Sequence, residues 1–242
     1  MKKDVLGIKI DDISLNQAVE IVIDWLKRSK SASLRSEKHY IVTPNPEIVV
    51  MAQSDEVFKK ALNNADLSIP DGVGLKLGTD IVCNTPGVDL MEALIKASLD
   101  YGFTIGLLGG REGVAEEASD CLRKKYPKLR INFAEGGGKV DDNGKLLKPL
   151  KQLKLLNCDI LFVAFGPPKQ EKWIAGNLDK ISVKVAMGVG GSFDYISGLV
   201  PRAPKLLRKL GLEWLFRLII QPWRIGRQLR LIKFLYLLAK GS

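Results

Sequence analysis

The chain has 242 residues, 46% of them hydrophobic and 26% charged, and a formal net charge of +10; the size and hydrophobic content are those of a globular protein with ample material for a core. Three scattered cysteines and one histidine argue against a structural zinc site and against a disulfide framework. No run approaches the roughly 18–20 apolar residues that span a bilayer, and the N-terminus lacks the apolar stretch of a signal peptide, so we expect a cytoplasmic protein with only peripheral membrane contact.

The first thirty residues predict one strand and one helix. Residues 5–10 favour a short strand, and a helix is expected to follow it. Ser14 is expected to cap that helix, because Gln17 three residues later completes a capping-box pattern.

Two β-rich runs follow, and each stops at a turn that carries polar side chains. Residues 39–42 stop at Thr43-Pro44-Asn45-Pro46, and residues 47–54 turn helical, since proline suits a first helical turn. Residues 65–69 alternate apolar and polar, as a short strand does, and end at Pro70-Asp71-Gly72. Both turns therefore place polar side chains directly after a strand.

From residue 103 the alternation of strands and helices is clearer. Helices are expected near 112–125 and from about 169, and mostly apolar strands that end in glycines are expected over 103–108, 129–134, 159–165 and 183–189. Apolar strands that alternate with helices predict a parallel sheet covered on both faces. We therefore expect an α/β, Rossmann-like domain over residues 1–198, with ligands bound beyond the carboxyl ends of its strands.

The positive charge is concentrated at the C-terminus. Residues 201–242 hold ten Lys/Arg and one Glu, a net charge of +9, which leaves +1 for the rest of the chain. A solvated basic face is one interpretation, but aromatic residues are interleaved with the basic ones, and one helical stripe is formed by Ile225, Leu229, Ile232 and Tyr236. We therefore predict that residues 199–242 form a basic amphipathic helical appendage that binds an anionic membrane surface.

Asp71 is the first candidate for catalysis. It lies on a glycine-flanked turn at the expected edge of the sheet, from which a carboxylate can reach a substrate hydroxyl and act as general base. Thr43 and Asn45 supply small hydrogen-bonding groups at the same edge. All three side chains can equally serve as turn formers, and the residues alone leave both interpretations open.

The glycines that follow the strands are candidate nucleotide-binding positions. Gly109-Gly110-Arg111 opens a helix after a strand, which brings free backbone N–H groups and a guanidinium to one place. Neither this segment nor 188–191 matches a dinucleotide fingerprint or a P-loop, and plain turns are the alternative. Gln170, in the proline-fixed turn that begins at Gly166, is suited to bond a sugar or a base.

A series of short segments runs in order from residue 43 to residue 224: Thr43-Pro44-Asn45-Pro46-Glu47, Asp71-Gly72-Val73-Gly74, Gly87-Val88-Asp89-Leu90, Gly166-Pro167-Pro168-Lys169-Gln170-Glu171, Gly188-Val189-Gly190-Gly191-Ser192-Phe193-Asp194, Arg202-Ala203-Pro204, Gly211-Leu212-Glu213-Trp214 and Pro222-Trp223-Arg224. Together these segments resemble the bacterial TagA/WecG/CpsF family of glycosyltransferases. No single segment is decisive, but the ordered set is specific and covers nearly the whole chain.

The resemblance implies an inverting, metal-free transfer of N-acetylmannosamine, or a related sugar, from a UDP-sugar donor to a polyprenyl-diphosphate-linked acceptor, undecaprenyl-diphosphate-linked N-acetylglucosamine. In the wall teichoic acid branch of the family this is an early committed step, which places the protein on the inner face of the cell membrane. The resemblance also implies that Asp71 is the general base and Thr43 its neighbour. The residues expected to bind substrate are Asn45, Gly109, Gly110, Arg111, Gly136, Gly166, Gln170, Gly190 and Asp194.

Two positions depart from the family pattern. Many members carry an arginine shortly before the Gly-Val-Asp-Leu segment, where this chain has Cys83-Asn84-Thr85-Pro86. Many also carry an aromatic residue after the glycines near 136, where this chain has Lys139. Donor contacts at those positions are therefore left open.

Neither a metal nor a cofactor is expected. The chain has no Asp-x-Asp pair, with which many nucleotide-sugar transferases hold a metal on the diphosphate. The charge of the leaving group then has to be met by backbone dipoles or by basic side chains. Besides Arg111, the candidates for this catalytic role are the arginines of the appendage. We expect three of them first of all to close over the donor: Arg202, Arg224 and Arg227.

Two other classes of function compete with this one. A soluble α/β dehydrogenase is disfavoured by the missing dinucleotide fingerprint. A nucleic-acid-binding α/β protein that uses the basic tail predicts strong, salt-dependent affinity for DNA or RNA and no turnover of a nucleotide sugar. We expect no nucleic-acid partner, and the sequence leaves a homo-oligomer open.

Overall fold

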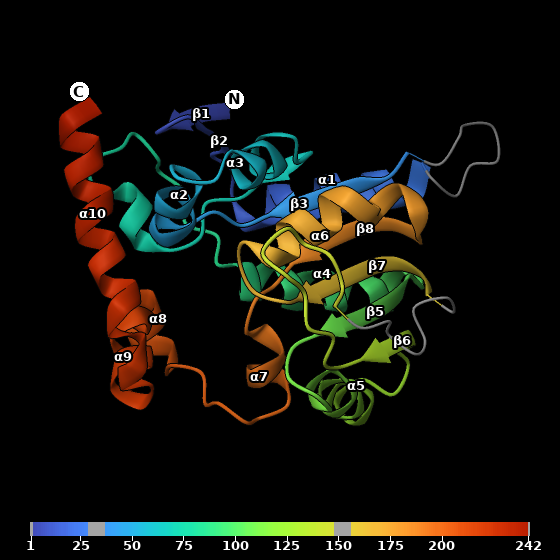
Figure 1. The fold of residues 1–242 in the computed structure, drawn as a ribbon. Coiled ribbons are helices and arrows are strands. Elements are labelled where there is room, and N and C mark those ends of the chain that lie inside the picture. The colour runs from blue at the N-terminus through green and yellow to red at the C-terminus, as the bar shows by residue number, and fades with distance from the viewer. Residues whose placement is uncertain (1, 29–36, 148–155, 242) are drawn as a thin grey trace.

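The computed structural model describes residues 2–28, 37–147 and 156–241, except for the side chains of Lys209, Arg224, Arg227 and Gln228. Its centre is a six-stranded sheet with the strand order β4-β3-β8-β7-β5-β6. Figure 1 labels the last five strands of this order. The strands are β3 (His39–Val42), β4 (Leu67–Ser68), β5 (Thr104–Gly109), β6 (Arg130–Glu135), β7 (Asn157–Ala164) and β8 (Ser182–Gly188). All pairings are parallel, so the expected parallel α/β sheet is confirmed.

Strands β7 and β8 come last in the chain but lie at the centre of the sheet. β8 pairs with β3, with His39 opposite Val185, and β7 pairs with β5, with Ile105 opposite Ile160. Because parallel strands end at the same edge, the loops after β7 and β8 lie in the middle of the carboxyl edge. That edge is where ligands bind in sheets of this kind.

Helices cover both faces of the sheet. One face packs against α2 (Pro46–Ala52), α3 (Glu56–Asn63) and α6 (Lys169–Asn177). The other packs against α1 (Leu15–Arg28), α4 (Gly87–Tyr101), α5 (Val114–Lys125) and α7 (Ser192–Ile196). Alternate residues of β7 enter the two cores, Leu161 and Val163 on one side and Ile160 and Phe162 on the other. This two-sided burial explains why the strands are almost entirely apolar.

The expectation of a single strand over 5–10 is wrong. Residues 2–11 form an antiparallel hairpin of β1 (Lys2–Val5) and β2 (Ile8–Asp11). The turn between them has positive φ at Leu6 and Gly7, 53° and 77°, and the Gly7 amide donates a hydrogen bond of 2.8 Å to the Asp4 carboxylate. A glycine that adopts the left-handed region allows the chain to reverse inside an apolar run.

The capping box at the start of α1 is confirmed. The Ser14 amide donates to the side-chain oxygen of Gln17 at 2.9 Å, and the Gln17 amide donates to the Ser14 hydroxyl at 3.4 Å. Two N–H groups that the helix itself leaves unpaired are satisfied in this way.

The C-terminal segment is helical, as expected. It comprises α8 (Lys205–Lys209), α9 (Glu213–Ile220), a 3₁₀ turn (Pro222–Arg224) and α10 (Ile225–Gly241). Helix α10 lies beside α2 at one edge of the molecule (Figure 1). Phe234 of α10 is fully buried in the same core as Tyr40 and Val42 of β3. The division into domains at residue 198 stays a prediction.

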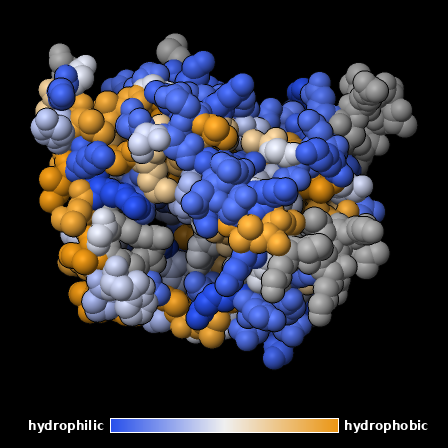
Figure 2. All heavy atoms as spheres, in the orientation of Figure 1, coloured by the Kyte–Doolittle hydropathy of each residue, from blue (hydrophilic) through white to orange (hydrophobic). Residues whose placement is uncertain are grey.

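The apolar stripe expected on α10 lies on its outward face. Ile225, Leu229, Ile232 and Tyr236 are between 57% and 65% exposed, whereas Phe234 points inward. Trp223 and Ile219 add further exposed apolar surface nearby, and Figure 2 shows apolar side chains gathered over the edge that α9 and α10 form. None of the described helices combines the length and the apolar content needed to cross a bilayer.

Candidate active site

Two cavities open at the carboxyl edge of the sheet. The Asp71 cavity, of about 460 Å³, lies between this edge and the C-terminal helices and is lined by residues that include Thr43, Asn45, Asp71, Asn84, Asp89, Gln170, Arg208, Glu213, Trp214 and Arg217. The Arg111 cavity, of about 490 Å³, is lined by residues that include Gly110, Arg111, Gly138, Lys139, Phe165, Lys169 and Asp194. Gly166, Gly190 and Gly191 line both cavities, so the loops after β7 and β8 form their common wall.

Asp71 is held by backbone hydrogen bonds on either side of its turn. Its amide donates to the Pro44 carbonyl at 2.8 Å, and the next amide, of Gly72, donates to the side-chain oxygen of Asn84 at 2.8 Å. The Asp71 carboxylate accepts a hydrogen bond from the amide of Gly87, the first residue of α4. The turn thus fixes the position of this carboxylate in the cavity wall.

The electrostatic environment of Asp71 suits a general base. Burial raises the pKa of Asp71 from 3.8 to about 6, and the negative charges of Glu213 and Asp89 add to the rise. The positive charge of Arg217 and the Gly87 N–H act in the opposite direction. A carboxylate with a raised pKa is a stronger base than one in water and is still ionised at neutral pH.

The structure brings Thr43 and Asn45 to Asp71, as expected. Thr43 packs against Gly87, where a β-carbon would lie 3.0 Å from the Thr43 hydroxyl oxygen. Asn45 caps α2, because its side-chain oxygen accepts a hydrogen bond of 3.0 Å from the Ile48 amide. Asn45 therefore has a local structural role, which was the alternative to substrate binding in the sequence analysis. It also lines the cavity.

Gln170 ties the two glycine loops together. Its side-chain oxygen accepts hydrogen bonds from the amides of Gly166, at 3.1 Å, and Gly190, at 3.0 Å. Its amide nitrogen donates to the Glu171 carboxylate at 2.8 Å. Glu171 is buried, and burial raises the pKa of its carboxyl to about 7. Gln170 therefore shapes the wall between the cavities from within.

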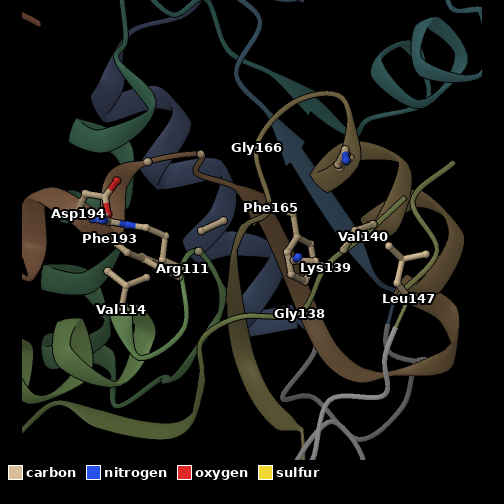
Figure 3. A pocket seen from close by; sticks show the side chains of 15 residues that line it. Arg111, Val114, Gly138, Lys139, Val140, Leu147, Phe165, Gly166, Phe193 and Asp194 are labelled. Atoms are coloured by element: carbon tan, nitrogen blue, oxygen red, sulfur yellow. Dashed lines mark hydrogen bonds and ion pairs between the residues drawn. The ribbon is translucent and has the colours of Figure 1, made fainter. Parts of the chain in front are cut away.

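The Arg111 cavity carries most of the remaining candidate residues. The guanidinium of Arg111 lies 3.1 Å from the carboxylate of Asp194, across the mouth of the cavity from Lys139 (Figure 3). Gly110 has a φ of 81°, and a β-carbon there would lie 2.4 Å from Val114. Only glycine fits at that position, which allows the backbone to line the cavity directly.

Gly109 and Gly136 are not among the residues that line the two cavities. A β-carbon at Gly109 would lie 2.7 Å from the ring of Phe165, so this glycine makes room for that ring. The Gly136 amide donates to the carboxylate of Glu116 at 3.0 Å. Within the described structure these two glycines have packing and hydrogen-bonding roles, and their contact with substrate stays a prediction.

The appendage contributes two arginines that belong to the expected group of tail arginines but are not the three expected first. Arg208 of α8 and Arg217 of α9 line the Asp71 cavity, whereas Arg202 is not among the lining residues. The side chains of Arg224 and Arg227 lie outside the described residues, so their catalytic role stays a prediction. The sequence pattern that indicates Arg217 is its spacing from Trp214. The two residues are three positions apart, which puts them on one face of a helix.

In the part of the chain that the structure describes, no three His, Cys, Asp or Glu side chains gather in a way that suits a metal ion. Arg208 and Arg217 each have a buried side-chain nitrogen, Nε, without a hydrogen-bond partner among the described residues. Cationic groups of this kind can meet the charge of a diphosphate.

Comparisons with known proteins show the family of the chain. The model of the family described as "Glycosyl transferase WecG/TagA/CpsF family" matches residues 3–242. Two proteins of Staphylococcus aureus, from strains MRSA252 and NCTC 8325 / PS 47, are 34% identical to this chain, and a third, from strain MW2, is 33% identical. Each match extends over 246 residues and covers 100% of this chain and 93% of the relative. All three are named N-acetylglucosaminyldiphosphoundecaprenol N-acetyl-beta-D-mannosaminyltransferase. The chain is thus a transferase enzyme that belongs to the WecG/TagA/CpsF family of glycosyltransferases.

Proposed function

We propose that this enzyme transfers N-acetylmannosamine from UDP-N-acetylmannosamine to undecaprenyl-diphosphate-linked N-acetylglucosamine, with inversion at the anomeric carbon. The observation that carries the proposal is the Asp71 carboxylate in a cavity that shares its wall with a second, basic cavity. The names of the relatives support the identity of the sugar and of the acceptor.

The Arg111 cavity is the proposed site of the nucleotide. Arg111, Lys139 and Lys169 provide positive charge at its rim, and glycine backbone lines its floor. The carboxylate of Asp194 can accept hydrogen bonds from ribose hydroxyls. In this arrangement the diphosphate and the sugar extend past Gly166 and Gly190 into the Asp71 cavity, where Arg208 and Arg217 lie.

The Asp71 cavity is the proposed site of the chemistry. The acceptor hydroxyl oxygen attacks the anomeric carbon while its proton passes to the Asp71 carboxylate. A new carbon–oxygen bond forms as the bond to the β-phosphate breaks, and the electron pair leaves with UDP. Arg208 and Arg217 are suited to stabilise the negative charge that develops on UDP.

UDP release with a panel of UDP-sugars tests the proposed donor. With the lipid-linked acceptor present, we expect UDP-N-acetylmannosamine to give the highest turnover and to require the acceptor. Equal UDP release without acceptor, or a clear preference for another UDP-sugar, would contradict the proposal.

We predict full activity in excess EDTA, because the proposed stabilisation of UDP relies on Arg208 and Arg217 instead of a metal ion. Initial rates with and without the chelator provide the measurement. Loss of turnover that added magnesium or manganese restores would refute the prediction.

The exposed apolar face of α9 and α10, with the basic residues around it, is the proposed membrane-binding surface. We predict that Ile232→Glu weakens binding to anionic vesicles about tenfold, because it removes an apolar contact and adds repulsion worth about 1 kcal/mol. Vesicle co-sedimentation measures the effect. Val57→Glu is the matched control, since Val57 on α3 is 61% exposed and Ile232 is 65% exposed. Equal loss in both variants would argue against a specific membrane-binding face.

A further inference from the structure

Arg202 connects the linker before α8 to two helices of the active-site region. Its guanidinium contacts the Asp89 carboxylate at 2.5 Å and the Glu92 carboxylate at 3.3 Å, both on α4, and the Glu213 carboxylate of α9 at 3.5 Å. Its side chain is 14% exposed. One partly buried cation therefore meets three carboxylates from two elements that are far apart in the sequence.

Two of these carboxylates also face Asp71. Asp89 lies in the first turn of α4, whose first amide, that of Gly87, donates to the Asp71 carboxylate. Asp89 and Glu213 both line the Asp71 cavity. Their charges oppose the ionisation of Asp71, whereas Arg217, 3.6 Å from Glu213, favours it.

The other described charges that line the cavity have partners of their own. Arg208 of α8 lies 3.6 Å from the Asp89 carboxylate. Glu47 of α2 pairs with Arg230 of α10. Arg202 is thus the described cation that contacts both Asp89 and Glu213, and it is not among the residues that line the cavity.

We propose that Arg202 is a positioning residue for the reaction: it acts through Asp89 and Glu213, holding α9 against α4 and neutralising the two carboxylates that flank Asp71. This inference rests on the proposed role of Asp71 as general base. It differs from the expectation drawn from the sequence, in which Arg202 itself contacts the donor. Removing a cation that contacts three partly buried carboxylates leaves their negative charge less compensated.

The test compares pH–rate profiles of Arg202→Gln, Arg202→Lys and the wild-type enzyme in transfer of sugar to the lipid-linked acceptor. Without the positive charge, Asp89 and Glu213 repel the ionised Asp71. We therefore expect the acidic limb of kcat/KM in Arg202→Gln to move up by about one pH unit. Above that limb the turnover should stay close to that of the wild type. Arg202→Lys keeps the charge and should keep the wild-type limb.

A second substitution separates electrostatic compensation from a purely structural role. Glu213→Gln removes one of the repelling charges, so the double variant Arg202→Gln/Glu213→Gln should return the limb toward its wild-type position. Glu92→Gln is the matched control, because Glu92 contacts Arg202 but does not line the Asp71 cavity. It should leave the limb in place. If Arg202→Gln does not fold on its own, the double variant is compared with Glu213→Gln, and its limb should lie at higher pH because Asp89 has lost its contact with Arg202.

The pKa of Asp71 can also be followed without turnover, by ¹³C NMR of labelled aspartate side chains, with Asp71→Asn to assign the signal. The same upward shift in Arg202→Gln and the same return in the double variant are expected. An unchanged Asp71 pKa, or turnover lost across the whole pH range, would overturn the inference and favour direct contact of Arg202 with substrate. Because this titration requires no transfer, its outcome is independent of whether the proposed reaction is correct.

Discussion

Asp71→Asn is expected to lower kcat for sugar transfer by about 10²–10⁴-fold, which is the typical contribution of a general base. Asparagine has nearly the same shape and keeps an oxygen that can accept the Gly87 N–H, but it cannot take a proton from the acceptor hydroxyl. Binding of UDP in the neighbouring cavity should be unchanged. Steady-state kinetics and UDP titration by calorimetry measure the two effects.

The wild-type pH profile provides a second check on Asp71. Because its pKa is raised to about 6, the ionised base is lost as pH falls through that value, and kcat/KM should fall with it. A free aspartate would place this limb nearer its ordinary value of 3.8. Asp71→Asn should show no such limb in its residual activity.

Measuring the thermal stability of Asp71→Asn distinguishes loss of the general base from loss of the fold. The folded-state pKa of Asp71 lies above the unfolded value, so ionisation of this carboxylate destabilises the native state as pH rises through about 4 to 6. At neutral pH, Asp71→Asn removes that cost, and its Tm should equal or exceed the wild-type value. Asp120→Asn, at an exposed position on α5, is the matched control and should keep full activity. Near-normal turnover by folded Asp71→Asn would rule out the assignment.

Arg217→Gln is expected to lower the plateau turnover by about 10²–10³-fold, the usual effect of removing one group that stabilises charge in a transition state. Arg217 lines the Asp71 cavity, lies over the ring of Tyr195 at 4.6 Å and is held by Glu213 at 3.6 Å. This packing fixes the guanidinium before the reaction. Rates measured above the acidic limb isolate the effect from any change in the ionisation of Asp71.

The sign of the change in pH profile adds a further check on Arg217. Its positive charge lowers the pKa of Asp71, so Arg217→Gln should also move the acidic limb to higher pH. Arg28→Gln removes an equal charge from an exposed ion pair with Asp24 and serves as the control. An Arg217→Gln enzyme with wild-type plateau turnover would show that this arginine has no part in departure of UDP.

Much of the fold could be predicted because strands and helices alternate with clear turns between them. Each apolar run after residue 39 that ended in glycine or proline became a parallel strand. The N-terminal hairpin was missed, because three of the four residues of β1 are charged and the reversal depends on positive φ at Leu6 and Gly7. Sequence periodicity does not register a turn of this kind inside a short apolar run.

The candidate site was predictable where it depends on strand ends. Thr43, Asn45 and Asp71 follow β3 and β4, which are neighbours, so their meeting follows from the sheet. The contributions of Arg208 and Arg217, and the cluster around Arg202, depend on how α8 and α9 pack on α4. No local pattern fixes that packing, and for the same reason burial of Glu171 beside Gln170 was not foreseen.

The most direct test is to incubate the enzyme with UDP-N-acetylmannosamine and undecaprenyl-diphosphate-linked N-acetylglucosamine in anionic vesicles, and to determine the mass and anomeric configuration of the lipid product. We predict a lipid that gains one N-acetylmannosamine in β linkage for each UDP released, with the donor's α configuration inverted. A lipid of unchanged mass despite UDP release, or a product with retained α configuration, would contradict a single displacement at Asp71.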